Sequence, residues 1–463
     1  MDYDIVAGVG PNKVLVVGAG KTGLAVARFC QQRGAQVTIT DKRSEAELGE
    51  ARAQAEHVRW ELGAHNPQSF VEADLIVVSP GVPDIEPLQL ARKKGVRITG
   101  EIELAAGFIQ APIVGVTGTN GKSTVTALAG EIAAKTGKPT FVGGNLGTPL
   151  ITAVGTPAAT LRGLVVVELS SFQLETVEKL HPRAAAFLNL TPDHLDRYAG
   201  VEAYGAAKLK LASNLVADDV AVINADDPFF WAAGERLRKR TRVRTFSARR
   251  TRDDNQRAID GVVDGQELVA LGERYPIGEL HLVGRHNLGN ALAAILLMRG
   301  NELATYDQVR AALGSFRPLP HRMQLVGDKR GLRFYDDSKA TNVDSVVAGL
   351  DGFPTPFVLI AGGRDKGGSY APMVRALRDN RCRAVVLIGE AADQIEAAIR
   401  AADDPAYDAV AVVRAASLED AVARAVERAE PGDAVVLSPA CSSYDMFDNY
   451  EHRGRVFAAA VEA

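Results

Sequence analysis

The sequence has little cysteine and no long apolar run, and each absence excludes a class of protein. Only Cys30, Cys382 and Cys441 occur in 463 residues, so neither a disulfide framework nor a zinc-ligand spacing can be read from them. No apolar stretch approaches the roughly 20 residues that a membrane-spanning helix needs. The N-terminal MDYDIVAGVG lacks the basic and apolar segments of a secretory signal. We therefore expect a soluble, cytoplasmic protein without a signal peptide or membrane insertion.

An excess of positive charge is also missing. The formal net charge of −4 argues against general binding to nucleic acid or to membrane surfaces, and is compatible with a local basic pocket for a phosphorylated ligand. With 46% hydrophobic and 24% charged residues, the chain has the composition of a globular protein that buries sizeable cores. Its length predicts about three domains.

The most informative stretch is IVGVTGTNGKSTVT at residues 113–126. A short apolar run predicts a buried strand, a glycine-rich turn follows, and a helical pattern begins after Gly121. In such a unit, backbone N–H groups and the helix N-terminus meet an anion. Lys122 would reach the outer phosphates and Ser123 would ligate Mg²⁺. Val116 stands where the usual G-x-x-x-x-G-K-[ST] pattern has its first glycine. An ordinary glycine-rich turn is the alternative; we interpret the stretch as a site for ATP or GTP.

A second glycine motif lies near the N-terminus. Residues 14–17 predict a buried strand, 18–23 form a G-x-G-x-x-G turn, 24–32 predict a helix, and a second strand at 37–40 ends at Asp41. This is a Rossmann-like start, with an acidic residue where a ribose hydroxyl would be held. Many α/β domains use such a turn without a dinucleotide, and the motif alone leaves both interpretations open.

Polar residues recur where predicted strands end. The strand at 164–168 ends in Glu168, and in P-loop proteins an acidic residue there commonly holds the Mg²⁺ shell. His194 follows the strand at 184–190 and is either a metal or phosphate contact, or an exposed neighbour of a helix-capping Asp193. Lys208 lies on a helix that we predict at residues 203–215, and its simplest interpretation is a residue on the solvated face of that helix.

The C-terminal part carries three further polar motifs beside strands. These are LPHR at 319–322, DDSKATN at 336–342 and SPACSS at 438–443. Because strands alternate with helices throughout, the sequence predicts an α/β fold with parallel sheets and helices on both faces. We place the domain bounds at 1–111, 112–316 and 317–463.

In order and spacing, GVTGTNGKST, DDSKATN, LPHR and SPACSS resemble the Mur ligase family over essentially the whole chain. The motifs are most similar to members that add D-glutamate. The resemblance implies an N-terminal Rossmann-like domain that binds a UDP substrate, a central P-loop ATPase-type domain, and a C-terminal Rossmann-like domain that closes over the centre. It implies ATP and two Mg²⁺ as cofactors, UDP-N-acetylmuramoyl-L-alanine and D-glutamate as substrates, an acyl-phosphate intermediate, and a monomer acting in peptidoglycan precursor synthesis.

The resemblance also implies roles for matching residues. Those implied to act in catalysis are Lys122, Asn145, His194 and Lys208. Those implied to bind ATP are Gly118, Thr119, Asn120, Gly121, Lys122, Ser123, Thr124, Asn290, Arg322 and Asp337. Those implied to bind Mg²⁺ are Ser123, Glu168, His194 and Lys208, the last as a carbamate. Those implied to bind substrates are Thr22, Asp41, Gly81, Asn145, Thr341, Lys366, Ser443 and Tyr450. Tyr450 stands where the family pattern has Phe, and Lys42 replaces a small hydroxyl residue.

Other functions stay open at this point. A nicotinamide-dependent dehydrogenase would explain the turn at 18–23 and Asp41, but it leaves the P-loop and DDSKATN without a role; a change in NADH fluorescence on mixing would favour it. Sister ligases for another amino acid, or a folate-polyglutamate ligase, fit the first domain and DDSKATN less well. An ATP-gated binding protein would release no ADP with all substrates present.

Overall fold

The computed structural model describes residues 12–463 apart from 54, 56, 195–196, 251–258, 366 and 402–409. The residues that lie close together in space group the chain into two compact units. The first comprises residues 1–262, 269–275 and 292–312, and the second comprises 263–268, 276–291 and 313–463. Within the described part of the chain, no helix combines the length and hydropathy needed to cross a bilayer.

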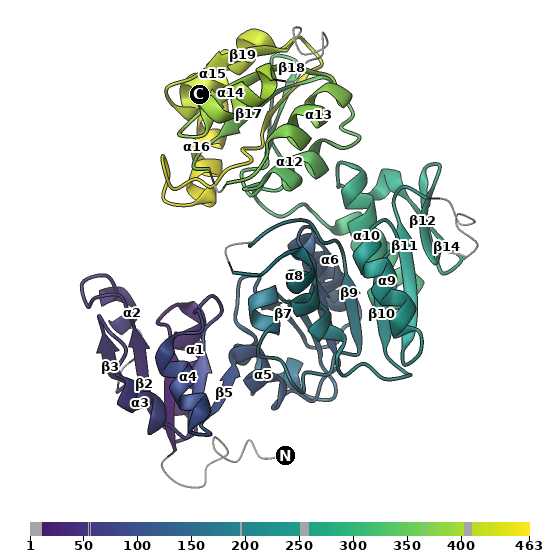
Figure 1. The fold of residues 1–463 in the computed structure, drawn as a ribbon. Helices are drawn as coiled ribbons and strands as arrows, with labels where there is room; N and C mark the ends of the chain where they lie inside the picture. The colour runs from purple at the N-terminus through teal and green to yellow at the C-terminus, as the bar shows by residue number, and fades with distance from the viewer. Residues whose placement is uncertain are drawn as a thin grey trace. The chain divides into compact units, whose positions relative to one another are not determined.

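The first unit begins with a five-stranded parallel sheet in the order β3-β2-β1-β4-β5 (Figure 1). Its strands are β1 (Lys13–Val17), β2 (Gln36–Asp41), β3 (Arg59–Leu62), β4 (Leu75–Val78) and β5 (Arg97–Gly100). Its helices are α1 (Lys21–Gln31), α2 (Gly49–Ala53), α3 (Pro67–Val71), α4 (Glu86–Lys93) and α5 (Glu101–Ala106). The strand order reverses between β1 and β4, and open α/β sheets bind ligands at such a point.

The central sheet has the order β14-β13-β12-β11-β10-β9-β6-β8-β7. Its strands are β6 (Ile113–Thr117), β7 (Thr140–Gly144), β8 (Leu164–Glu168), β9 (Ala184–Phe187), β10 (Val220–Asn224), β11 (Arg242–Ser247), β12 (Gly261–Asp264), β13 (Glu267–Ala270) and β14 (Glu273–Pro276). Every residue of β6, β8 and β9 is buried, as expected for parallel strands covered on both faces. Because β6 pairs in parallel with both β8 and β9, the polar residues that follow these three strands meet at one edge.

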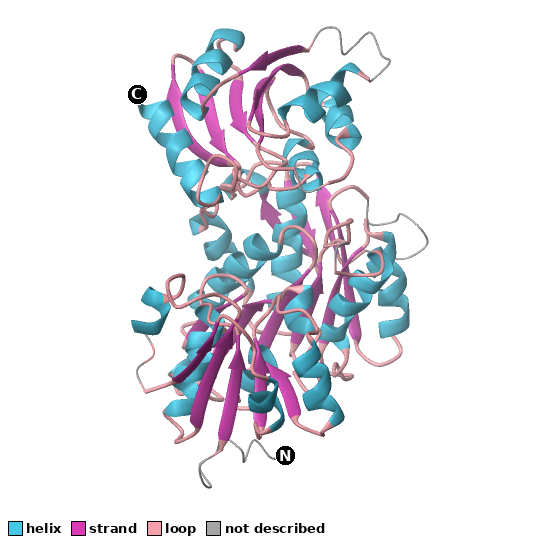
Figure 2. Ribbon diagram, turned by 60° about the vertical axis from the view of Figure 1, so that its left-hand side comes forward, coloured by secondary structure: helices cyan, strands magenta, loops and turns pink. Residues whose placement is uncertain are grey.

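Helices surround the central sheet (Figure 2). The α-helices are α6 (Lys122–Lys135), α7 (Ser171–Leu174), α8 (Val201–Leu209), α9 (Pro228–Leu237), α10 (Arg285–Arg299) and α11 (Tyr306–Ser315). Short 3₁₀ turns are η1 (Leu150–Ala153), η2 (Pro157–Ala159), η3 (Lys210–Ala212) and η5 (Ile277–Glu279). Helix α10 divides between the units, since residues 285–291 cluster with the second unit and the remainder with the first.

The third sheet, in the second unit, has the order β15-β16-β20-β17-β18-β19. Its strands are β15 (Gln324–Lys329), β16 (Leu332–Asp336), β17 (Phe357–Gly362), β18 (Cys382–Ile388), β19 (Ala411–Arg414) and β20 (Ala434–Leu437). Its helices are α12 (Val343–Leu350), α13 (Ala371–Asp379), α14 (Ala392–Arg400), α15 (Leu418–Arg428) and α16 (Tyr450–Glu462). Successive residues of β17 belong to two separate cores. Leu359 packs in the core formed with α12, α13 and α14, and Ile360 packs in the core formed with α15 and α16. Both faces are therefore covered.

The predicted α/β class and three sheets are confirmed, with local differences. Strand β15 pairs antiparallel with β16 at the sheet edge, where a short connection makes this pairing easy. Residues 261–276 form three short strands, β12, β13 and β14, that extend the central sheet. The predicted helix at 203–215 ends earlier, at Leu209, and continues as a 3₁₀ turn. The domain bounds remain a prediction.

Candidate active site

The glycine-rich loop after β6 has a backbone that only glycine adopts easily. Gly118 has φ 152° and Gly121 has φ 84°, both in the region that L side chains avoid. A Cβ on Gly118 would also lie 2.9 Å from the Cβ of Leu188. Helix α6 starts at Lys122, directly after Gly121, and presents its N-terminus to the loop. The geometry is that of an anion-binding strand–loop–helix unit.

Asn189, which follows β9, holds this loop in shape. Its carbonyl oxygen accepts from the Thr119 N–H at 2.8 Å, and its side-chain oxygen accepts from the Asn120 N–H at 2.7 Å. Its amide nitrogen donates to the Asn120 carbonyl at 3.0 Å. Sequence reasoning missed Asn189, and the only available signal was a polar residue at a strand end.

Two lysines converge on one carbonyl of the loop. Lys122 Nζ donates to the Gly118 oxygen at 3.0 Å and to the Thr119 oxygen at 2.7 Å. Lys208 Nζ donates to the same Gly118 oxygen at 2.7 Å and lies 4.1 Å from the centre of the Tyr204 ring. Lys208 is 1% exposed, so its interpretation as a solvated face is wrong. Burial, together with the charge of Lys122, lowers the pKa of Lys208 well below its ordinary value.

A half-satisfied carboxylate lies at the end of β8. Glu168 Oε1 accepts from Asn145 Nδ2 at 2.7 Å, while Oε2 is buried without a hydrogen-bond partner in the described structure. A buried carboxylate oxygen without a donor is unfavourable unless a cation neutralises it. No group of three or more His, Cys, Asp or Glu side chains is arranged to hold a metal ion among the described residues. Mg²⁺ commonly takes only one or two carboxylates, so Glu168 and the buried Ser123 fit such a site.

His194 lies beside these groups in a strained backbone. It has φ 54°, and its ring is 4.8 Å from that of Phe172 and 5.9 Å from that of Tyr204. The N-cap of α8 is Gly200, so Asp193 does not cap that helix; Asp193 Oδ1 instead accepts from the His194 N–H at 2.9 Å. The helix cap in the alternative interpretation is therefore wrong, whereas its exposed His194 agrees with the structure, in which this side chain is 42% exposed.

The reversal point of the first sheet carries the residues predicted to bind the UDP substrate. Asp41 accepts from the Ala19 N–H at 2.8 Å and from Arg43 Nη2 at 2.7 Å. Burial would raise the pKa of Asp41, but the hydrogen bonds from Arg43 and Ala19 hold it well below its ordinary value. Arg43 was not among the predicted residues. Gly81 has φ 88° in the turn after β4, and Thr22 lies in the first turn of α1.

Arg197 connects the region predicted to bind substrate with the P-loop region within the first unit. Its guanidinium binds Glu175 Oε2 at 2.6 Å and donates to the Val82 carbonyl at 3.3 Å. Because Val82 follows Gly81 and Arg197 lies close to His194 in sequence, the structure brings these two predicted regions together.

Of the remaining predicted residues, Thr124 lies in the first turn of α6, and the other described ones lie in the second unit. Asp337 accepts from Ser438 Oγ at 2.8 Å and from the Met323 N–H at 3.2 Å, and burial raises its pKa to about 7. Asn290 Nδ2 donates to Asn287 Oδ1 at 3.1 Å. Of the others, Arg322 and Thr341 are half-buried, Ser443 is buried, and Lys366 lies outside the described residues.

Tyr450, the first residue of α16, lies beside the DDSKATN loop. Lys339 Nζ is 3.7 Å from the centre of the Tyr450 ring, and Ser338 Oγ donates to the Tyr450 carbonyl at 2.9 Å. His321 contacts the same ring edge-on, with centroids 6.1 Å apart. Lys339 lies within a motif that we singled out but was not itself predicted as a site residue.

Three family models match the chain. They are the Mur ligase MurD-like N-terminal domain over residues 12–100, the Mur ligase middle domain over 116–298, and the Mur ligase glutamate ligase domain over 321–441. The chain belongs to the Mur ligase family. The P-loop with Val116 at the usual glycine position thus opens a Mur ligase middle domain.

Curated relatives agree with this assignment. The UDP-N-acetylmuramoylalanine–D-glutamate ligase of Geotalea daltonii is 45% identical over 461 residues, covering 98% of this chain and 97% of that one. The protein of the same name from Geobacter sp. (strain M21) is 46% identical over 462 residues, covering 98% of each.

Solved structures show the same fold at low identity. The MurF ligase of Thermotoga maritima in complex with ADP is 17% identical with a TM-score of 0.58, covering 100% of this chain and 99% of that one. The pseudomurein peptide ligase type C of Methanothermus fervidus is 18% identical with a TM-score of 0.59, covering 97% of this chain and 99% of that one. The three-sheet architecture is therefore that of the Mur ligases.

Proposed function

We propose that this chain is an ATP-dependent ligase that joins D-glutamate to UDP-N-acetylmuramoyl-L-alanine, releasing ADP and phosphate, in cytoplasmic peptidoglycan precursor synthesis. Relatives that carry the name of this activity match nearly the whole chain at 45% and 46% identity. The structural observation that carries the proposal is the convergence of Lys122 and the buried Lys208 on the Gly118 carbonyl. A nicotinamide-dependent dehydrogenase would give this arrangement no role.

The chemistry requires positive charge where two anions meet. A carboxylate is a poor acyl donor and must first take the γ-phosphoryl group, forming an acyl phosphate that the amine of D-glutamate then attacks. Lys122 would neutralise the transferring phosphoryl group, and Asn145, which donates to Glu168 at 2.7 Å, would orient the reacting carboxylate. Bound Mg²⁺ would supply further neutralisation of the phosphate oxygens during transfer. Ser123, Glu168, His194 and Lys208 would hold the two ions.

Lys208 would serve such a site only after modification. Its lowered pKa favours the neutral amine, which can attack CO₂. Formation of the N–C bond with loss of one proton leaves a carbamate, so a neutral amine, whose protonated form repels Lys122, becomes an anion. The carbamate would attract Lys122 instead of repelling it, and its oxygens are ligands that suit Mg²⁺.

The second unit would complete the active site. Asn290 would contact the adenine, Asp337 the ribose and Arg322 the phosphates. Thr341, Lys366, Ser443 and Tyr450 would surround D-glutamate, while Thr22, Asp41 and Gly81 would hold the UDP moiety. This assignment corresponds to domains at 1–111, 112–316 and 317–463 in a monomer, with the last closing over the centre. Small-angle scattering should then show compaction on adding an ATP analogue and substrates.

The direct test is phosphate release from ATP and Mg²⁺ with UDP-N-acetylmuramoyl-L-alanine, with and without D-glutamate. L-Glutamate and L-lysine serve as controls. Release that requires both the nucleotide precursor and D-glutamate is expected. Release with another amino acid would keep the family and change the substrate, and no release with any pairing would overturn the ligase assignment.

A further inference from the structure

A cavity of about 410 Å³ lies at the amino-terminal edge of the central sheet. Its lining includes Ile113 at the start of β6, Arg183 just before β9 and Asp219 just before β10. The P-loop follows the opposite, carboxyl end of β6. The cavity is therefore separate from the candidate active site, and neither the family match nor the proposed reaction gives it a role.

The two walls of the cavity differ in chemistry. One wall is the connection between α5 and β6, and it presents the apolar side chains of Ile109, Pro112 and Ile113. The other wall carries three basic residues, Lys179, His181 and Arg183.

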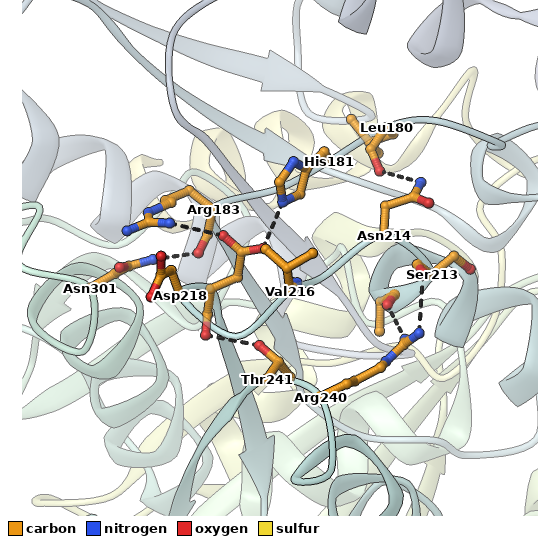
Figure 3. A network of polar contacts seen from close by, with 12 residues as sticks. Leu180, His181, Arg183, Ser213, Asn214, Val216, Asp218, Arg240, Thr241 and Asn301 are labelled. Carbon is orange, nitrogen blue, oxygen red and sulfur yellow. Dashed lines mark hydrogen bonds and ion pairs between the residues drawn. The ribbon is translucent and has the colours of Figure 1, made fainter.

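A buried carboxylate holds the basic wall in place. Asp219 accepts from His181 Nε2 at 2.6 Å, from Arg183 Nη1 at 3.2 Å and from the Val216 N–H at 2.8 Å. In Figure 3, dashed lines run from His181 and Arg183 to the carboxylate that both residues bind, and Asn301 is bound to the Arg183 carbonyl. Asp219 thus orients His181 and Arg183. Its carboxylate accepts three hydrogen bonds, none of them from Lys179.

The positive charge available to a ligand on this wall is that of Lys179. Lys179 and Arg183 provide two positive charges, and the negative charges nearby are those of Asp219 and Glu103, whose carboxylates are buried and already hydrogen-bonded. The Lys179 side chain is exposed and forms no ion pair with a described residue.

The cavity is also formed in advance of any ligand. Glu103 of α5 accepts hydrogen bonds from the backbone N–H groups of residues 178–180, at 3.1, 2.9 and 3.1 Å. The Arg183 N–H donates to the Ile113 carbonyl at 2.7 Å. These bonds tie the basic wall to both ends of the apolar wall, so binding would require little reordering.

We propose that this cavity binds a small organic anion, that is, an anionic group attached to an apolar body. The volume suits a ligand of that size, and an apolar wall facing a few converging polar groups is the usual construction of a ligand site. Lys179 and Arg183 would hold the anionic group, and Ile109, Pro112 and Ile113 would cover the apolar body. The ligand would contact both the segment that leaves α5 and the central sheet.

The test uses methyl NMR on the full-length protein labelled at isoleucine δ1 methyl groups. Mg·ADP is present at saturation to keep anions from the P-loop. Phenyl phosphate is the probe, with inorganic phosphate and neutral benzyl alcohol as comparisons. Saturable shifts are expected at Ile109 and Ile113 and not at Ile360 in the second unit. Phenyl phosphate should bind more tightly than either comparison compound.

Two charge reversals complete the test. Lys179→Glu should weaken phenyl phosphate binding about tenfold or more, the loss expected from removing one charge-assisted contact. Lys138→Glu reverses another exposed lysine outside the cavity and should leave binding unchanged. Unshifted methyl groups, equal binding of benzyl alcohol or of inorganic phosphate, or full binding by Lys179→Glu would each overturn the proposal. None of these measurements uses turnover, so their outcome is independent of the ligase assignment.

Discussion

Replacing Asn189 tests whether this side chain, which lies outside the P-loop sequence, shapes the loop for nucleotide. Asn189→Ala removes two hydrogen bonds, at 2.7 Å from the Asn120 N–H and at 3.0 Å to the Asn120 carbonyl. The bond from the Thr119 N–H to the Asn189 carbonyl, at 2.8 Å, survives because it uses the backbone. At about 1 kcal/mol for each lost bond, the variant should lose about 2 kcal/mol of stabilisation of the loop.

This loss should appear in nucleotide binding. If the loop is disordered in the free variant, ATP must order it on binding, and about 2 kcal/mol corresponds to a rise of about 30-fold in Kd. The measurement is titration calorimetry with ATP and Mg²⁺ in the absence of the other substrates. We expect the Kd to rise by up to this factor, with little change in kcat at saturating ATP.

A matched control separates loop shaping from general destabilisation. Asn214 donates through Nδ2 to the carbonyls of Glu178 and Leu180, at 2.9 and 3.0 Å, far from the P-loop end of the sheet. Asn214→Ala should lower the free energy of unfolding by a similar amount and leave the Kd for ATP unchanged. Equal Kd values for the two variants and the wild type would refute the role assigned to Asn189.

Three further predictions follow from single positions. Lys208→Ala should abolish phosphate release, and a small carboxylate such as formate should restore part of it; no rescue across a range of carboxylates would count against the carbamate. Burial raises the pKa of Glu101 to about 7, above its unfolded value, so its contribution to stability is present below about pH 4.5 and is lost as pH rises through 7. In calorimetric melts, the stability of Glu101→Gln relative to the wild type should therefore increase between pH 5 and 8. A stability difference that does not change with pH would contradict the raised pKa of Glu101. Gly118→Ala should eliminate ATP binding, because the added Cβ would lie 2.9 Å from Leu188 Cβ. Gly314→Ala is the control: it lies in open space within α11, so it should leave ATP binding unchanged and keep or raise the stability of the protein.

Some features of this chain follow from local sequence alone. The buried strand, glycine turn and helix start around Lys122 are encoded within about a dozen residues, because burial, positive φ and helix initiation are local properties. The same holds for the Rossmann-like start that ends at Asp41. The motifs also carried the resemblance to the Mur ligase family, which the family models confirm.

The residue pattern by itself could not place other features, because they depend on which strands become neighbours. Only the resemblance to the Mur ligase family assigned Lys208 to the active site. Lys208 is 90 residues from Gly118 in the sequence, and the helical pattern around it is equally consistent with a solvated face. It meets Lys122 because β6 lies between β8 and β9, an order that the sequence of strands does not specify. The same order brings Asn189 to the P-loop.

The amino-acid sequence by itself determined the class of fold, the phosphate-binding loop and the family. Tertiary structure alone decided the protonation preference of Lys208, the unsatisfied oxygen of Glu168 and the basic wall on Asp219. The physical reason is that desolvation and charge coupling depend on distances between residues far apart in the chain, whereas strand, turn and helix signals depend on neighbours within a few positions.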